Sequence, residues 1–131
     1  MLVDTSAIIA LFDDDDHWHQ EAKRFFDQED FSWVTVDVTA HEVYTRVRYD
    51  RDCIRALQHY DFLHSGRMTV ISFAREDESS ARAILEKYSD HKISFHDALC
   101  AAVMLRIGAY RVFAFDKHFW IMGFEMLPGW L

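Results

Sequence analysis

The sequence contains two cysteines, one proline and four glycines among its 131 residues, and each of these low counts excludes a class of protein. Cys53 and Cys100 both fall inside helical patterns, which argues against a disulfide framework. Because proline and glycine are so scarce, no stretch has the composition of an interdomain linker. We therefore expect the whole chain, residues 1–131, to form a single domain.

Long hydrophobic runs are also missing. No run approaches the roughly 18 apolar residues that a membrane span requires. Asp4 interrupts the first apolar run almost at once, so the N-terminus does not have the pattern of a signal peptide. On these grounds we expect a cytoplasmic protein.

Basic residues are outnumbered. The chain has 14 Lys and Arg against 22 Asp and Glu, which gives a formal net charge of −8. Phosphate contacts supply most of the non-specific affinity for nucleic acid, and this overall charge opposes them. Binding to RNA or DNA would therefore need a local basic face, bound cations, or both.

What the sequence does contain is an alternation of short apolar runs with amphipathic segments. Half of the residues are apolar and 15% are aromatic, which is enough to build a packed core. Such alternation predicts a mainly parallel sheet with helices on both faces, that is, a three-layer α/β/α sandwich. The predicted strands are 1–4, 31–36, 68–73, 112–115 and 124–127, and the predicted helices are 5–12, 17–28, 75–89 and 95–107, a helix that opens at Thr39 and continues or restarts through 51–64, and a short helix or turn at 117–122.

Four acidic residues stand at the ends of predicted strands or in the first turns of predicted helices. Asp4 and Asp116 each end an apolar strand, while Glu42 and Asp97 lie at helix starts. Binding sites in open parallel sheets form at the carboxyl ends of the strands. We therefore expect the four carboxylates to converge on one site.

Each acid also has a simpler interpretation as a helix cap. Glu42 fits a capping box with Thr39, and Asp97 fits one with Ser94. The other two acids could cap the segments that follow them. Four caps at one sheet edge would nevertheless bring like charges together, and each would raise the pKa of the next.

A divalent cation is the ordinary solution to such repulsion. Because the expected ligands are oxygens and no Cys or paired His has metal-binding spacing, the sequence favours Mg²⁺ or Mn²⁺ over zinc. Thr5, Ser6 and Ser94 carry hydroxyls next to the acids and are expected to hold the carboxylates or a water in place. By helical geometry, His96 and His118 are expected to point away from the acids.

Other polar groups give weaker indications. The acidic run Asp13–Asp16 is expected to be a solvated turn, with Asp16 capping the next helix. If the helix around residue 50 is continuous, Arg48, Arg51 and Arg55 share one face. That face is either a contact for RNA phosphates or a merely solvated surface.

Four stretches together resemble a known family. They are Val3–Ser6 (Val-Asp-Thr-Ser), Thr39–Glu42 (Thr-x-x-Glu), Ser94–Ala98 (Ser-Phe-His-Asp-Ala) and Val112–Asp116 (Val-Phe-Ala-Phe-Asp). Their order and spacing resemble PIN-domain ribonucleases, most closely the small free-standing VapC-type toxins. The resemblance covers essentially the whole chain. It implies an α/β/α sandwich around a parallel sheet.

The resemblance also implies a function. It implies an endoribonuclease that depends on Mg²⁺ or Mn²⁺, with Asp4, Glu42, Asp97 and Asp116 as the catalytic and metal-site acids. It implies a cognate antitoxin whose tail covers the acidic groove, and a homodimer. An RNA loop, as in tRNA or rRNA, is the expected substrate because a splayed single strand can enter a groove that a duplex cannot. The alternative is a non-catalytic PIN-like domain that binds a protein partner through its aromatic-rich surface.

Overall fold

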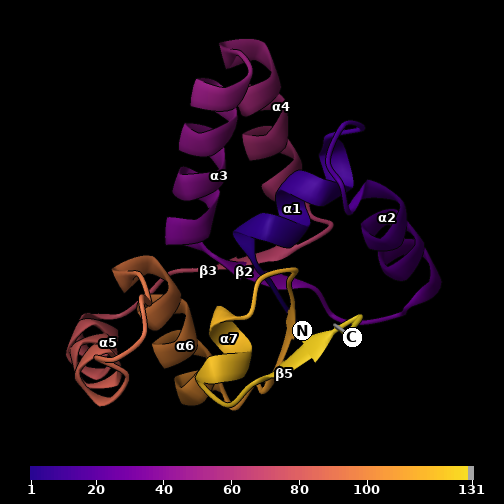
Figure 1. Cartoon of the computed structure of the whole chain (residues 1–131). Coiled ribbons are helices and arrows are strands. Elements are labelled where there is room, and N and C mark those ends of the chain that lie inside the picture. The colour runs from indigo at the N-terminus through magenta and orange to yellow at the C-terminus, as the bar shows by residue number, and fades with distance from the viewer. Residues whose placement is uncertain (130–131) are drawn as a thin grey trace.

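The computed structural model describes residues 1–129, and this range contains five strands and seven helices (Figure 1). The strands are β1 (Leu2–Val3), β2 (Val34–Val36), β3 (Thr69–Ile71), β4 (Arg111–Phe113) and β5 (Glu125–Leu127). The helices are α1 (Thr5–Phe12), α2 (His19–Gln28), α3 (Asp37–Asp50), α4 (Cys53–Leu63), α5 (Arg75–Lys87), α6 (Phe95–Ile107) and α7 (His118–Ile121).

The five strands form one parallel sheet in the order β3-β2-β1-β4-β5. Helices α1 to α4 lie on one side of this sheet and α5 to α7 on the other (Figure 1). The fold class predicted from the sequence, an α/β/α sandwich around a parallel sheet, is therefore confirmed. Strand β1 is central, between β2 and β4, so the residues that follow β1 and β4 emerge side by side.

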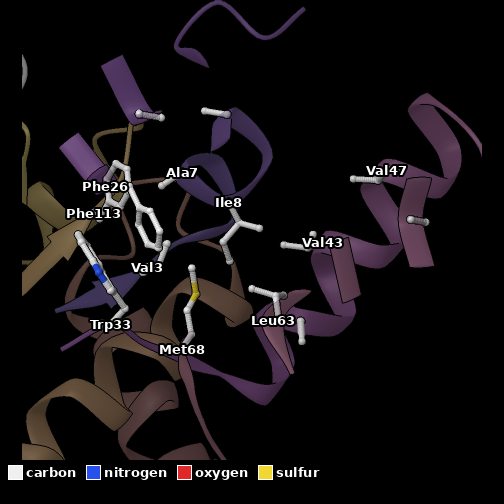
Figure 2. Close-up of a cluster of buried hydrophobic side chains, with 14 residues drawn as sticks. Val3, Ala7, Ile8, Phe26, Trp33, Val43, Val47, Leu63, Met68 and Phe113 are labelled. Atoms are coloured by element: carbon white, nitrogen blue, oxygen red, sulfur yellow. The ribbon is translucent and has the colours of Figure 1, made fainter. Parts of the chain in front are cut away.

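The core on the α1–α4 side is built around aromatic rings (Figure 2). Phe113 of β4 is fully buried and contacts Phe25 and Trp33 edge-on or tilted, with ring centroids 4.9 and 5.7 Å apart. Trp33 also packs against Phe26 at 4.8 Å. These contacts hold α2 against the sheet and fix the end of β4, three residues before the candidate site residue Asp116.

The bounds of some helices were predicted correctly from local sequence patterns. Helix α1 and helix α6 have the predicted bounds. Ser94 caps α6 by accepting a hydrogen bond from the Asp97 backbone N–H at 3.0 Å, as predicted. Gly108 ends α6 in the left-handed region at φ 75°, a conformation that favours glycine.

Two predictions about helix starts were wrong. Helix α3 begins at Asp37 rather than Thr39, directly after β2, so Thr39 and Glu42 do not form a capping box. Helix α2 begins at His19, and Asp16 does not cap it; the Asp16 carboxylate instead accepts from the Trp18 backbone N–H at 2.8 Å. Helix α3 therefore follows β2 without a connecting residue, and α2 begins only after a local turn closed by Asp16.

The region around residue 50 contains two helices rather than one. Helix α3 ends at Asp50, and Arg51 leaves the helical conformation at φ −129°, ψ −103°. Asp52 then caps α4 by accepting from the Arg55 backbone N–H at 2.7 Å. The single helical face that the sequence argument gave to Arg48, Arg51 and Arg55 therefore does not exist.

Among the described residues, none of the helices is both long and apolar enough to cross a membrane.

Replacing Phe113 by Ala should destabilise the protein by about 3–5 kcal/mol, because it removes a fully buried ring and leaves a cavity among its aromatic neighbours. Urea unfolding measures this decrease. Tyr49→Ala is the control, since Tyr49 is 85% exposed and its removal should change stability by no more than about 0.5 kcal/mol. Equal effects of the two substitutions would contradict the packing described above.

Candidate functional site

Asp4 lies at the carboxyl end of the central strand and caps α1. Its side chain is 2% exposed. The Oδ2 atom accepts from the Ser6 hydroxyl at 3.1 Å and from the Ser6 backbone N–H at 3.5 Å. The Oδ1 atom is buried and has no hydrogen-bond partner among the described residues. A buried carboxylate oxygen without a donor is costly, and this cost makes Asp4 a strong candidate to bind a cation.

Asp97, in the first turn of α6, is 7% exposed, and each of its oxygens faces a histidine. Oδ1 lies 3.2 Å from His96 Nδ1, and Oδ2 lies 2.8 Å from His118 Nδ1. Two imidazoles therefore hold this carboxylate in one orientation.

Glu42 reaches the site through His96. Its Oε2 atom lies 2.7 Å from His96 Nδ1, the same nitrogen that faces Asp97. On the other side of the ring, His96 Nε2 lies 2.9 Å from the hydroxyl of buried Thr39. Thr39 and Glu42 thus act on the same histidine from the first two turns of α3, and this contact replaces the predicted capping box.

Asp116 reaches the site through His118. The Asp116 Oδ1 atom lies 3.5 Å from His118 Nδ1 and accepts from the His118 backbone N–H at 3.1 Å. Asp116 therefore does cap the turn before α7, and it also joins the cluster. The resulting chain of contacts alternates acid and base, in the order Glu42, His96, Asp97, His118, Asp116.

The prediction that both histidines point away from the acids was wrong. His96 and Asp97 are adjacent on α6, but the His96 ring turns back so that Nδ1 approaches the Asp97 carboxylate. His118 comes from the segment after β4, so the geometry of α6 places no limit on its direction. The signal available in the sequence was that each histidine lies within two residues of a candidate acid.

The pKa values of the cluster follow from this geometry. Burial, followed by the charges of Asp116 and Asp97, raises the pKa of Asp4 to about 8. Burial opposes the charged form of His96, but its hydrogen bonds, first among them the one to Asp97, raise its pKa to about 12. Burial would also raise the pKa of Asp97, yet the two histidines hold it below its usual range.

The donor atoms fit a divalent cation. One ligand atom each from Asp4, His96 and Asp97 lies within 4.8 Å of the others. Both nitrogens of His96 are already engaged, by carboxylates on one side and Thr39 on the other, so the oxygens are the atoms best able to bind an ion. The buried Oδ1 atom of Asp4 is the clearest of these. Oxygen donors suit a hard cation.

The predicted hydroxyl residues occupy three different environments. Ser6 links two segments, because its Oγ donates to Asp4 and accepts from the Phe115 backbone N–H at 3.0 Å. Ser94 caps α6 and so fixes where the helix that carries Asp97 begins. Thr5 is buried, and its Oγ1 has no hydrogen-bond partner among residues 1–129.

The predicted arginines lie outside this cluster. Arg51 pairs with Asp13 at 2.8 Å, which ties the loop after α1 to the end of α3. Arg55 lies 3.6 Å from Asp52 at the start of α4. The run Asp13–Asp16 is accordingly only partly a solvated turn, because its first member holds Arg51.

The fold and the site together define a class of protein: a parallel α/β domain with a cluster of carboxylates beyond the carboxyl ends of its central strands. The PIN domain family model matches residues 1–124, and the chain therefore belongs to the PIN domain family. The family resemblance drawn from the sequence is confirmed.

Several solved structures are similar to this chain. VapC20 of Mycobacterium tuberculosis, described as a toxin that cleaves the sarcin–ricin loop, matches with a TM-score of 0.89 and 27% identity over 94% of this chain and 95% of that chain. FitAcB of Neisseria gonorrhoeae matches with a TM-score of 0.73 and 14% identity over 95% and 94% of the two chains. VapBC2 of Rickettsia felis, solved with a DNA fragment from its promoter, matches with a TM-score of 0.68 and 14% identity over 95% of each chain.

At 14% identity the last two structures support the fold alone. A comparison with curated protein sequences finds no significant match.

The raised pKa of Asp4 predicts how stability depends on pH. Between pH 3.8 and about 8, folded Asp4 keeps a proton that the unfolded chain has released, so the metal-free protein should lose stability as the pH rises through this window. Asp4→Asn removes this contribution and should flatten the decline. Urea unfolding in EDTA across the window measures both slopes.

His96 must be separated from this effect. Its raised pKa contributes stability that is complete below pH 6.5 and is lost as the pH rises toward about 12, a decline of the same sign. The informative quantity is therefore the difference between the wild-type and Asp4→Asn slopes. Identical slopes would mean that Asp4 is ionised throughout.

Proposed function

We propose that this PIN domain is a metal-dependent endoribonuclease and the toxin of a type II toxin–antitoxin pair. The observation that carries the proposal is the buried Asp4 oxygen that has no partner among the described residues, on a side chain that has a ligand atom within 4.8 Å of one from Asp97. The similarity to a toxin described as cleaving the sarcin–ricin loop supports RNA as the substrate class, and tRNA or rRNA is the proposed kind of RNA.

Asp4, Glu42, Asp97 and Asp116 are the proposed catalytic and metal-site acids, and Mg²⁺ or Mn²⁺ is the proposed cation. When bound, such an ion activates water and offsets the negative charge that builds on a phosphodiester during its hydrolysis. Asp4 and Asp97 are the pair whose ligand atoms lie close enough to share one ion, together with a His96 nitrogen. Glu42 contacts this pair through His96, and Asp116 contacts it through His118.

The other residues of the site position these acids. Ser6 fixes one oxygen of Asp4, and the other oxygen is the proposed ligand atom. His96, braced by Thr39, keeps Glu42 and Asp97 at a set separation. Acids held in place before the substrate arrives need no reorganisation during the reaction, which is the general basis of electrostatic catalysis.

The proposed partners are RNA, a cognate antitoxin and a second copy of the chain. Several similar structures are toxin–antitoxin complexes, which supports the antitoxin. Arg48, Arg51 and Arg55 remain proposed phosphate contacts, although Arg48 lies in α3, Arg55 in α4 and Arg51 between the two helices, where it is paired with Asp13. Replacing any one arginine that binds a phosphate should lower the salt slope of RNA binding by about one unit.

A second function, that of a non-catalytic PIN-like interaction domain, would use the same fold. Exposed aromatic residues such as Tyr49, Tyr110 and Trp120 favour it. A binding module, however, has no use for a buried carboxylate pair whose repulsion helps to raise the pKa of Asp4 to about 8. The cluster therefore favours the enzyme.

Mg²⁺ or Mn²⁺ should raise the melting temperature of the protein, because a ligand that binds only the folded state stabilises it by about 2.7 kcal/mol at a hundred times its Kd. Asp97→Asn should abolish the shift by removing one ligand. Asp14→Asn is the matched control, since Asp14 is an exposed carboxylate whose Oδ1 faces His19, away from the cluster. Differential scanning calorimetry with each metal measures the shift, and an undiminished shift in Asp97→Asn would place the ion elsewhere.

The purified protein, freed of any partner, should cut single-stranded or looped RNA when Mg²⁺ or Mn²⁺ is present. EDTA, Asp4→Asn and Asp97→Asn should each stop the cleavage, because the acids cannot approach a phosphodiester without a cation between them. Gel analysis of total RNA, with Asp14→Asn as the active control, measures this. Cutting by Asp97→Asn equal to that of wild type would identify a contaminant. If wild type is inactive with every metal but binds a protein partner tightly, the interaction-domain function is correct.

A further inference from the structure

Trp18 forms a parallel aromatic pair with Phe115 on the surface of the molecule. The two ring centroids are 5.1 Å apart and the planes differ by 9°. Trp18 is nevertheless 41% exposed, an unusual position for the largest apolar side chain. His17 stands nearly perpendicular to it at 4.7 Å and 76°. Trp18 thus exposes part of its ring to solvent while it stacks on a second ring.

The pair is fixed from both sides. The Trp18 backbone N–H donates to the Asp16 carboxylate at 2.8 Å, which anchors the residue before α2 begins. The Phe115 ring packs edge-on against fully buried Phe113 at 5.8 Å. The aromatic contacts therefore run without a break from the core to the surface, and the orientation of Trp18 is set before any ligand binds.

The same pair adjoins the acidic cluster. Phe115 is the residue before Asp116, and its backbone N–H donates to the Ser6 hydroxyl that also holds Asp4. Through Phe115, Trp18 is therefore linked to Asp116, the next residue, and by way of Ser6 to Asp4. A molecule whose phosphodiester lies at the acids would have its neighbouring groups within reach of this ring.

We propose that Trp18, backed by Phe115, is a stacking platform for an unpaired nucleobase of the RNA, adjacent to the phosphodiester that is cut. The inference rests on the nuclease function proposed above and names how that substrate is held. Bases of single strands commonly stack on aromatic side chains, and such stacking is tolerant of sequence because every base has a π-face.

The charge of the protein favours a base over a phosphate at this position. The net charge is −8, and the acidic run Asp13–Asp16 directly precedes His17 and Trp18 in the chain. These charges repel a phosphate but not the face of a neutral base. Stacking thus supplies affinity for RNA that does not depend on positive residues, which are the minority in this acidic protein.

The test uses a short unstructured RNA oligonucleotide and the full-length protein, with Ca²⁺ in place of Mg²⁺ to slow cleavage. Trp18→Leu keeps an apolar side chain over Phe115 but removes the flat ring. It should weaken binding by about fivefold to a hundredfold, the usual effect of removing one stacked base. The slope of log affinity against log salt should stay unchanged, because the substitution removes no positive charge. Trp120→Leu, which removes another exposed tryptophan, should leave the affinity unchanged.

A set of oligonucleotides in which each base in turn is replaced by an abasic sugar locates the stacked base. One such replacement should weaken binding to wild type but not to Trp18→Leu, because the two changes remove the same interaction. Melting temperatures of both variants check that they fold, and Trp18→Phe, which keeps a flat ring, should restore most of the affinity.

The outcomes separate the two proposals. If wild type and Trp18→Leu bind and cut RNA equally well, the platform is wrong and the nuclease stands. If Trp18→Leu binds RNA normally but no longer binds a protein partner, the ring belongs to a protein interface and the platform is again wrong. If wild type binds no RNA with any metal, the proposed nuclease function fails together with the platform.

Discussion

The mutual repulsion of carboxylates is the constraint on which the site depends. Strands β1 and β4 are neighbours in a parallel sheet, Asp4 directly follows β1, and Asp116 lies three residues past β4, so that the charges of Asp116 and of Asp97 in α6 both act on Asp4. The fold does not relieve this crowding by exposing the acids, since Asp4 and Asp97 are almost fully buried. Instead, histidine side chains lie between the acids. One oxygen of Asp4 has no hydrogen-bond donor within residues 1–129.

This arrangement divides the acids into two kinds. Asp97 is held by His96 and His118 in a fixed orientation, and its pKa stays low. Asp4 is held on one oxygen by Ser6, and burial raises its pKa to about 8. A cation bound between Asp4 and Asp97 would satisfy the buried oxygen of Asp4 and cancel the repulsion, so stability and ligand binding draw on the same electrostatic interaction.

The negative net charge of the protein limits the ways in which it can bind RNA. With a net charge of −8, the protein has no general attraction to phosphate. Two other sources of affinity are proposed, a cation at the carboxylates and an aromatic face beside them. Both positions lie at one edge of the sheet, joined through Ser6 and Phe115. The proposed chemistry and the proposed RNA contact are therefore neighbours in space although Trp18, Asp97 and Phe115 are far apart in the sequence.

Local sequence determined the class of fold, the bounds of α1 and α6, and the positions of the acids, because apolar periodicity, the Ser94 cap and Gly108 act within a few residues. Local sequence could not determine that α3 starts at Asp37, that the helix is interrupted at Arg51, or that His96 and His118 turn toward Asp97. Helix α3 starts where β2 ends, Arg51 at the break is paired with the distant Asp13, and His96 and His118 face carboxylates from other segments. Contacts between distant residues exist only once the sheet has formed, so the sequence could point to the acids as candidates, and the network of contacts that holds them was decided by the tertiary structure.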